Sequence, residues 1–214
     1  VKTEAVVLKS MKYGETSRIV TFYTREFGKL AGIVKGARQA KNRFGASLQP
    51  MSYVALVMYK KDGRDLQLVS QCDVMKPFRA LMENLDKMAV GMSIIEMISN
   101  IAHEEEGNEP LFQQLVDSLT ALNDGHGSPV NLFFHFELRL AGILGFRPVF
   151  DYCIECNRHL SNRDEEMNFH LEKGGPVCVN CISGLKGLVT RVTGNSHHVL
   201  SQIDKANVND RFDA

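Results

Sequence analysis

Four cysteines form two pairs in the last third of the 214-residue chain, at Cys153, Cys156, Cys178 and Cys181. Each pair is a Cys-x-x-Cys knuckle, and the separation between Cys156 and Cys178 is one position more than is usual for a zinc ribbon. Two such knuckles can close a tetrahedral cage of thiolates around one zinc ion. Because four protein ligands leave no position for water or substrate, the pattern predicts a structural zinc ion rather than a catalytic one.

The alternative interpretation of these cysteines is a pair of disulfides. We expect no secretory signal in this chain, and a fifth cysteine, Cys72, stands far from the other four. An odd number of cysteines with Cys-x-x-Cys pairs and no export signal is typical of reduced thiols inside the cell. The pattern therefore favours zinc over a disulfide or redox role, and Cys72 is expected to be a small buried residue.

Several histidines offer further metal ligands. His159 and His170 lie between the two knuckles and could replace a cysteine. Because four thiolates already complete a tetrahedral set, we expect both to be loop histidines. His197 and His198 are adjacent on a polar stretch, and such pairs are usually exposed to solvent.

The net charge of zero hides a strong asymmetry along the chain. Residues 1–80 carry 15 Lys and Arg against 6 Asp and Glu, whereas residues 81–214 carry 10 against 19. A basic N-terminal part is the usual electrostatic footprint of a polyanionic partner such as nucleic acid. The alternative is that these basic residues only solvate the surface of a β domain.

Other classes of function find little support in the sequence. No apolar run approaches the roughly 20 residues that a helix needs to cross a bilayer. There is no glycine-rich phosphate loop of the Walker type, and the acidic run from Glu104 to Glu106 is expected to be a solvated helix end. We therefore expect a cytoplasmic protein that is not an enzyme.

The N-terminal part of the chain, residues 1–80, has the pattern of a β domain. Short segments rich in β-branched and aromatic residues alternate with glycine turns, and Lys61-Asp62-Gly63-Arg64 is a hairpin signal. Five short strands over about 70 residues predict a small closed barrel of the size of an OB-fold. The predicted strands are Glu4–Leu8, Arg18–Thr24, Lys29–Lys35, Tyr53–Tyr59 and Leu66–Ser70.

Helical patterns begin after Pro77. Residues 79–103 are almost continuously apolar and predict one buried helix. Residues 110–123 predict an amphipathic helix opened by Pro110, and residues 129–144 predict a third helix with Ser128 as its N-cap.

These elements predict a multi-domain α+β protein, with an N-terminal five-stranded OB-fold barrel and an all-α helical domain that carries an inserted four-cysteine zinc module. We assign the basic barrel to residues 1–78 and the helical domain to residues 79–149. The zinc module takes residues 150–185. Residues 184–199 are weakly patterned, with helix expected near their end, and residues 186–214 are predicted to return to the helical domain.

Basic residues cluster in the middle of the predicted barrel. Only Glu26 opposes them, and residues 39–47 form a polar loop in which several of them lie. A strand that ends in a cation and continues into a basic flexible loop can follow a phosphate backbone. The candidate nucleic-acid-binding residues are Arg25, Lys29, Lys35, Arg38, Lys41 and Arg43.

Aromatic side chains near this cluster could stack on bases. Phe22 and Tyr23 lie in a predicted strand, and Phe44 lies in the basic loop. A place in the barrel core is the better interpretation for Phe22, whereas both interpretations remain open for Phe44.

The order and spacing of several blocks give the chain its resemblance to a known family. The resemblance covers essentially all of residues 1–190, and the last block leads into the first zinc knuckle. They are Tyr13-Gly14-Glu15, Thr21 to Thr24, Gly28-Lys29, Lys35-Gly36-Ala37-Arg38, Leu48-Gln49-Pro50, Phe136-Glu137-Leu138-Arg139-Leu140 and Leu144-Gly145-Phe146-Arg147-Pro148. In these blocks the chain resembles RecO, the bacterial recombination-mediator and DNA-repair family.

The resemblance implies an OB-fold, a helical domain and a zinc module. It implies a nucleoid-associated protein that binds single- and double-stranded DNA and anneals complementary strands. It also implies that the protein works with RecR to load RecA on strands coated by single-strand-binding protein. The chain departs from the family in ending at Ala214, since members usually continue for about another helix.

The resemblance also ranks the candidate residues. The Lys-Gly-Ala-Arg block of the family is intact, which places Lys35 and Arg38 first for DNA. Arg139 lies in a matched block and could meet the carboxylates of the acidic tail of single-strand-binding protein, or it could be an ordinary surface cation. The main alternative function is a protein-interaction adaptor in which the acidic helical domain is the working part.

Overall fold

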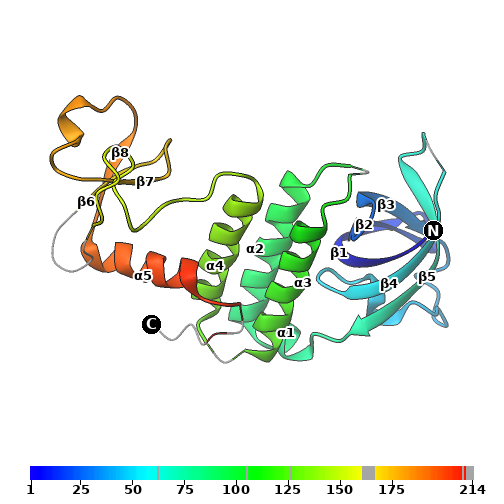
Figure 1. Ribbon diagram of the computed structural model, residues 1–214. Coiled ribbons are helices and arrows are strands. Elements are labelled where there is room, and N and C mark those ends of the chain that lie inside the picture. The colour runs from blue at the N-terminus through cyan, green and yellow to red at the C-terminus, as the bar shows by residue number, and fades with distance from the viewer. Residues whose placement is uncertain (62, 105, 126, 161–166, 209, 211–214) are drawn as a thin grey trace. The chain divides into compact units, whose positions relative to one another are not determined.

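The computed structural model describes residues 1–214 except 62, 105, 126, 161–166, 209 and 211–214 (Figure 1). The chain forms two compact units, Val1–Gly125 and His126–Ala214. No helix in the described ranges is long and apolar enough to cross a membrane.

Five strands close into a barrel in the first unit. They are β1 (Lys2–Tyr13), β2 (Ser17–Thr24), β3 (Gly28–Val34), β4 (Tyr53–Tyr59) and β5 (Leu66–Lys76). Their order around the barrel is β1-β2-β3-β5-β4, and the parallel pairing of β3 with β5 is one of the contacts that close it (Figure 1). The predicted OB-like barrel is confirmed, with β1 and β5 longer than expected.

The extension of β1 has a local cause. A register shift between Val7 and Lys9 lets the polar residues after Leu8 continue to pair with β2 as far as Tyr13. Such a bulge bends a strand and increases its twist, which a small barrel requires. The sequence pattern missed this part of the strand because its residues are mostly polar and exposed.

The barrel core consists of the inward-facing residues of all five strands. Alternation along β3 and β4 sends every second residue inward, as the pleat requires. Phe22 and Cys72 are both buried in this core, as predicted, and burial raises the pKa of the Cys72 thiol to about 11. Phe44 also belongs to the core, because a short 3-10 helix, Gly45–Leu48, folds the loop back over the barrel.

Three helices follow the barrel in the described part of the first unit: α1 (Arg79–Glu83), α2 (Leu85–Ile101) and α3 (Glu109–Asp124). The prediction of one helix over 79–103 is wrong, because the chain breaks at Asn84. Asn84 has an extended backbone, and its side chain accepts a hydrogen bond from the Lys87 N–H at 3.0 Å, which makes it the N-cap of α2. Asparagine favours such caps over helix interiors, and the apolar pattern across 79–103 concealed this signal.

The start of α3 agrees with its prediction. Asn108 is the N-cap and accepts a hydrogen bond from the Leu111 N–H at 3.0 Å, while Pro110 occupies the first turn. Proline is tolerated there because its missing N–H would have no partner inside the helix. The apolar face of α3 buries Phe112 against two aromatic rings of the barrel, Tyr23 at 6.1 Å and Tyr53 at 6.4 Å.

Two α-helices, a short 3-10 helix and a small sheet form the regular structure described in the second unit. The helices are α4 (Pro129–Ile143), α5 (Gly194–Lys205) and the 3-10 helix Ile182–Gly184. The strands β6 (Met167–His170), β7 (Gly175–Val177) and β8 (Val189–Val192) pair in the order β7-β6-β8. Ser128 caps α4 as predicted, by accepting from the Asn131 N–H at 3.4 Å.

The expectation of an exposed His197 is wrong. His197 lies on the inner side of α5, where its Nε2 is 2.7 Å from the carbonyl oxygen of Phe150, and its ring meets the Phe150 ring edge-on. Burial lowers the pKa of His197. The buried face of α5 carries His197, Ser201, Ile203 and Asp204. Because three of these four residues are polar, no apolar period marked this face in the sequence.

The turn between β2 and β3 generates a prediction about backbone conformation. Gly28 has a φ of +61°, and a Cβ at this position would clash with the backbone of Glu106, whereas Gly14 has a φ of +56° and open space around it. Gly14→Ala should therefore cost only the left-handed strain of about 1 kcal/mol. Gly28→Ala should cost about 3 kcal/mol or more, because overpacking adds to the strain.

Denaturant unfolding of both variants measures this difference. Tyrosine fluorescence reports mainly on the first unit, which holds four of the 5 tyrosines. Equal destabilisation by the two substitutions would contradict the close approach of Glu106 to Gly28.

Candidate nucleic-acid interface and metal centre

The four predicted cysteine ligands come together in the second unit. Their sulfur atoms all lie within 4.8 Å of one another, and the Sγ atoms of Cys156 and Cys178 are 3.8 Å apart. A zinc–sulfur distance of about 2.3 Å in a tetrahedron requires sulfurs about 3.8 Å apart. The donor set is therefore compatible with a zinc site.

Local backbone structure shapes each knuckle. The Asn157 N–H donates to the Cys153 carbonyl at 2.9 Å, and Asn157 adopts a left-handed φ of +56° that turns the chain after the first pair. The Cys181 N–H donates to the Cys178 carbonyl at 3.0 Å in the second knuckle. The two knuckles meet because the Ile154 N–H donates to the Pro176 carbonyl at 3.0 Å.

The chain between the two knuckles turns back at Lys173-Gly174-Gly175. Gly174 has a φ of +64°, and the β6–β7 hairpin that it closes carries the chain back to the first knuckle. Gly175 packs directly against the Ile154 side chain and leaves no space for a Cβ. This hairpin accounts for the spacing between the two knuckles along the chain.

The electrostatics of the four thiols favour a cation. Burial raises the pKa of Cys153, but backbone N–H groups of Cys178, Cys156 and Glu155 lower it more, and the result is a pKa of about 6. Hydrogen bonds with the sulfur atoms of Cys178 and Cys156 raise the pKa of Cys181 to about 12, and repulsion from the Cys156 thiolate adds to this. A bound metal ion removes this conflict, since it stabilises all four thiolates together.

Neither histidine between the knuckles joins the cysteine cluster. His170 ends β6, and its ring nitrogens face the Lys186 carbonyl at 3.0 Å and the Lys173 N–H at 3.3 Å. The His159 ring packs edge-on against Tyr152 at 5.3 Å. Four cysteines are therefore the donor set that the described residues bring together.

Lys35 lies in the first unit, directly after β3, at one side of a groove of about 500 Å³. Lys61 and Arg64, from the loop between β4 and β5, line the same groove together with Tyr59. These three residues are not among those predicted to bind nucleic acid. The alternation along β4 could have identified Tyr59, because it places this residue on the outer face with Tyr53, Ala55 and Val57.

A buried glutamine fixes the loop that carries two of these cations. Gln67 is 1% exposed, and its Oε1 accepts from the Lys61 N–H at 2.8 Å. Its Nε2 donates to the carbonyl oxygens of Lys61 at 3.0 Å and Arg64 at 2.8 Å. These three bonds hold the backbone of both residues beside the groove.

The other residues of the predicted basic loop lie on the exposed surface of the barrel. Arg38 donates to the Gly14 carbonyl at 2.7 Å, which ties it to the β1–β2 turn. Arg43 donates to the Ser70 carbonyl at 2.5 Å and stacks over the Phe44 ring at 5.2 Å. Lys41 is exposed between them.

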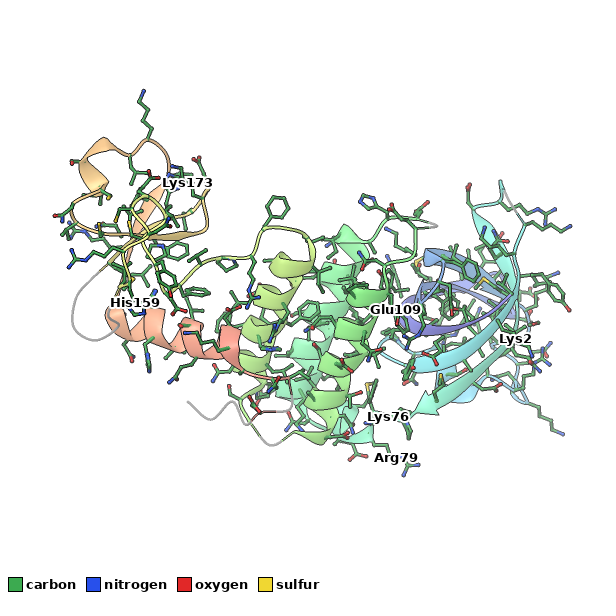
Figure 2. The ribbon with its side chains drawn as sticks, in the orientation of Figure 1. Lys2, Lys76, Arg79, Glu109, His159 and Lys173 are labelled. Atoms are coloured by element: carbon green, nitrogen blue, oxygen red, sulfur yellow. The ribbon has the colours of Figure 1, made fainter. Side chains whose placement is uncertain are left out.

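Arg25 and Lys29 have a different environment from the other candidates. Arg25 forms ion pairs with Glu4 and Glu109 and stacks over Phe112 at 4.7 Å; Figure 2 shows Glu109 where α3 meets the barrel. Lys29 donates from its Nζ to the Ser99 carbonyl at 3.1 Å. Both cations therefore connect the barrel to the helices of their own unit.

The three aromatic candidates for base stacking are all buried. Phe22 is in the barrel core as expected, and Phe44 joins it there. Tyr23 is covered by Phe112, and burial raises its pKa to about 12. The possibility that Phe44 stacks on bases is thus wrong, because the loop that bears it folds inward.

Arg139 lies on α4 in the second unit. Its Nη2 donates to the carbonyl oxygen of Ala206, at the end of α5, at 3.1 Å, and its Nε lies 3.4 Å from Nε2 of His135. The guanidinium therefore takes part in joining α4 to α5.

Comparison with known proteins agrees with this geometry. The family model described as "Recombination protein O N terminal" matches residues 1–78, and the one described as "Recombination protein O C terminal" matches residues 82–210. The chain belongs to the recombination protein O family. The resemblance found in the sequence blocks is thereby confirmed.

Relatives of this family include several proteins named DNA repair protein RecO. The one from Salinibacter ruber is 43% identical over 71% of this chain and 58% of its own length. The one from Chloroherpeton thalassium is 34% identical over 76% of the chain and 62% of its own length, and the one from Chlorobium limicola is 37% identical over 82% and 69%. The chain thus spans less than two thirds of the length of the first two RecO relatives.

The cysteine cluster leads to a prediction for this RecO family member. Cys153→Ser should abolish metal binding and unfold residues 150–185 locally, because the thiolate cage supplies much of the stability of such a small module. Metal content by native mass spectrometry and limited proteolysis test this expectation. Cys72→Ala, which removes a buried cysteine outside the cluster, should leave both measurements unchanged; unchanged proteolysis in Cys153→Ser would argue against a structural site.

The Glu4 carboxylate leads to a prediction about pH. A hydrogen bond from Tyr53 at 2.7 Å lowers the pKa of Glu4, burial opposes this, and Arg25 lowers it further. A carboxyl with a lowered folded-state pKa adds stability above its unfolded pKa, and this stability is lost as the pH falls through the folded value. Glu4→Gln should therefore destabilise the first unit by about 1 kcal/mol at pH 7, allowing for solvent screening.

The difference in the free energy of unfolding between the wild type and Glu4→Gln should persist down to about pH 5. It should disappear below pH 4.5, the ordinary pKa of a glutamate side chain. Denaturant unfolding at a series of pH values measures it. Tyr53→Phe removes the hydrogen bond that is the largest cause of the lowered Glu4 pKa. The folded-state pKa of Glu4 should therefore rise, and the loss of stability on acidification should begin at higher pH. A difference that stays constant from pH 7 to pH 3 would contradict the assignment.

Proposed function

We propose that this chain is a non-enzymatic DNA-binding recombination mediator that acts in DNA repair. It binds single- and double-stranded DNA and anneals complementary strands. The observation that carries the proposal is the groove beside Lys35, Lys61 and Arg64 on a closed five-stranded barrel, in a chain of the RecO family. DNA binding belongs to residues 1–78 in this proposal.

Annealing by such a surface needs no covalent chemistry. Cations on the barrel neutralise phosphates and release their counterions, which drives binding and lowers the repulsion between two strands. Lys35 and Arg38 lead this surface, and Lys41 and Arg43 extend it along the loop. Arg25 and Lys29 contribute to the basic field but hold the barrel to the helices rather than contact DNA directly.

The partners of this function come from the family. RecR joins the protein on DNA, single-strand-binding protein presents its acidic tail to the helical domain at residues 79–149, and RecA is loaded as the result. Arg139 meets the carboxylates of that tail while its Nη2 remains bonded to Ala206. One zinc ion bound by the four cysteines stabilises the module at residues 150–185. Residues 186–214 return to the helical domain. The protein acts at the nucleoid in the cytoplasm.

A salt titration of DNA binding tests this function. The anisotropy of a labelled, mixed-sequence single-stranded oligonucleotide should show binding that weakens steeply with salt. Lys35→Ala/Arg38→Ala should weaken binding about tenfold. It should also reduce the slope of log affinity against log salt by about 1.4, since each phosphate contact on a single strand contributes about 0.7.

A control variant removes the same charge elsewhere. Arg79 begins α1 and Lys173 lies in the β6–β7 turn, and both are labelled in Figure 2. Arg79→Ala/Lys173→Ala should leave affinity nearly unchanged. No binding by the wild type at low salt would mean that the basic charge serves another anion or a protein, and the adaptor function would then take its place.

A further inference from the structure

A continuous row of apolar side chains crosses the outer face of the barrel. Backbone pairing places Met11 beside Ile19, Ile19 beside Ile33, Ile33 beside Leu68, and Leu68 beside Tyr59. Paired residues on neighbouring strands point to the same face of a sheet. The five residues therefore form one line across β1, β2, β3, β5 and β4, which we call the apolar row.

The apolar row lies on the outside of the barrel, where three of its members are exposed and Ile19 and Ile33 are half-buried. Its inward-pointing neighbours, such as Val20, Val34 and Val69, form the core. Tyr59 is 65% exposed, Met11 is 46% exposed and Leu68 is 38% exposed. Single exposed apolar residues are common, but an aligned and contiguous set marks a surface that binds something.

Charged groups around the apolar row indicate the chemistry of the ligand. Ile33, Leu68 and Tyr59 line the groove of about 500 Å³, whose basic residues are Lys35, Lys61 and Arg64. No acidic residue lines this groove among the described residues. An apolar floor with a cationic rim suits a ligand that is both aromatic and anionic.

The groove is also positioned before any ligand arrives. The buried Gln67 fixes the backbone of Lys61 and Arg64 through three hydrogen bonds, and β-pairing fixes Ile33, Leu68 and Tyr59. A ligand therefore meets an ordered floor, which reduces the entropy lost on binding.

Single-stranded nucleic acid fits this description better than a duplex does. An unpaired strand can turn its bases toward an aromatic or apolar surface while its phosphates meet cations. In a duplex the base faces are stacked inside the helix, and only phosphates and groove edges reach a flat protein surface. At a strand spacing of about 4.8 Å, the apolar row extends about 19 Å around the curved wall of the barrel. The members that share the groove, Ile33, Leu68 and Tyr59, span about 10 Å of it, which accommodates more than one stacked base.

We propose that the apolar row is a base-stacking platform, with Tyr59 as its aromatic element, that makes this barrel prefer single-stranded over double-stranded DNA. This inference rests on the proposed DNA-binding function and assigns strand preference to particular side chains. Lys35, Lys61 and Arg64 bind phosphates of either form, whereas Tyr59 and Leu68 contribute only when bases are unpaired.

Substitutions in the apolar row separate stacking from charge. Tyr59→Ala should weaken binding of a single-stranded oligonucleotide about tenfold, which corresponds to the loss of one stacked base. Its affinity for a duplex of the same sequence should change less than twofold. Tyr59→Phe keeps the ring and should bind as the wild type does, and Leu68→Ala should give a smaller loss in the same direction.

A fluorescent base provides a second readout. 2-Aminopurine placed within the oligonucleotide loses fluorescence when it stacks, so the wild type and Tyr59→Phe should quench it and Tyr59→Ala should not. Met75→Ala is the matched control, since Met75 is 46% exposed on the same strand as Leu68 but outside the apolar row. Thermal melting checks that each variant is folded.

The outcomes distinguish the platform from the function on which it rests. If Tyr59→Ala and Leu68→Ala bind both DNA forms as the wild type does, while Lys35→Ala/Arg38→Ala loses binding, the platform is refuted and the DNA-binding function stands. Equal losses on both forms also refute the platform, because the residues would then act without reading unpaired bases. A wild type that binds neither form refutes both proposals.

Discussion

Closure of the barrel is the constraint on which the functional surface depends. The parallel pairing of β3 with β5 brings the end of β3 against the start of β5, although the basic loop and the whole of β4 lie between the two strands in sequence. Because the five-stranded sheet closes on itself, one face of every strand is committed to the core and the other is left for partners. The same closure aligns Ile33, Leu68 and Tyr59 in one line.

The outer face is then divided between internal and external use. At one end, α2 and α3 cover the barrel, and the cations found there, Arg25 and Lys29, bind carboxylate or carbonyl oxygens of the same unit. Lys35 and Lys61 line a separate groove in which no acidic residue is described, and Arg64 lines both this groove and a pocket that it shares with Lys29 and Glu104. The basic residues of residues 1–80 therefore include some that hold the barrel to the helices and others that a polyanion could reach.

The sequence predicted what depends on local pattern and missed what depends on tertiary contact. Strand alternation gave the five-stranded barrel, and Cys-x-x-Cys spacing gave the complete cysteine cluster. Phe44 could not be assigned, because only the fold of its loop over the barrel decides that it is buried. Alternation along β4 marks Tyr59 as an outward-facing residue, but its place in the apolar row depends on a strand pairing that one strand alone does not reveal.

The two units differ in how they are held together, and this separates their roles. The first has a continuous core of barrel side chains and an aromatic cluster around Phe112, and neither requires a metal. The second has a sheet whose strands are three or four residues long, too short to bury a core of comparable size. A metal bound by the four cysteines would compensate by linking segments that the sheet alone would not hold. The proposed metal would therefore act on the fold of the second unit, whereas the surface proposed for DNA depends on the barrel alone.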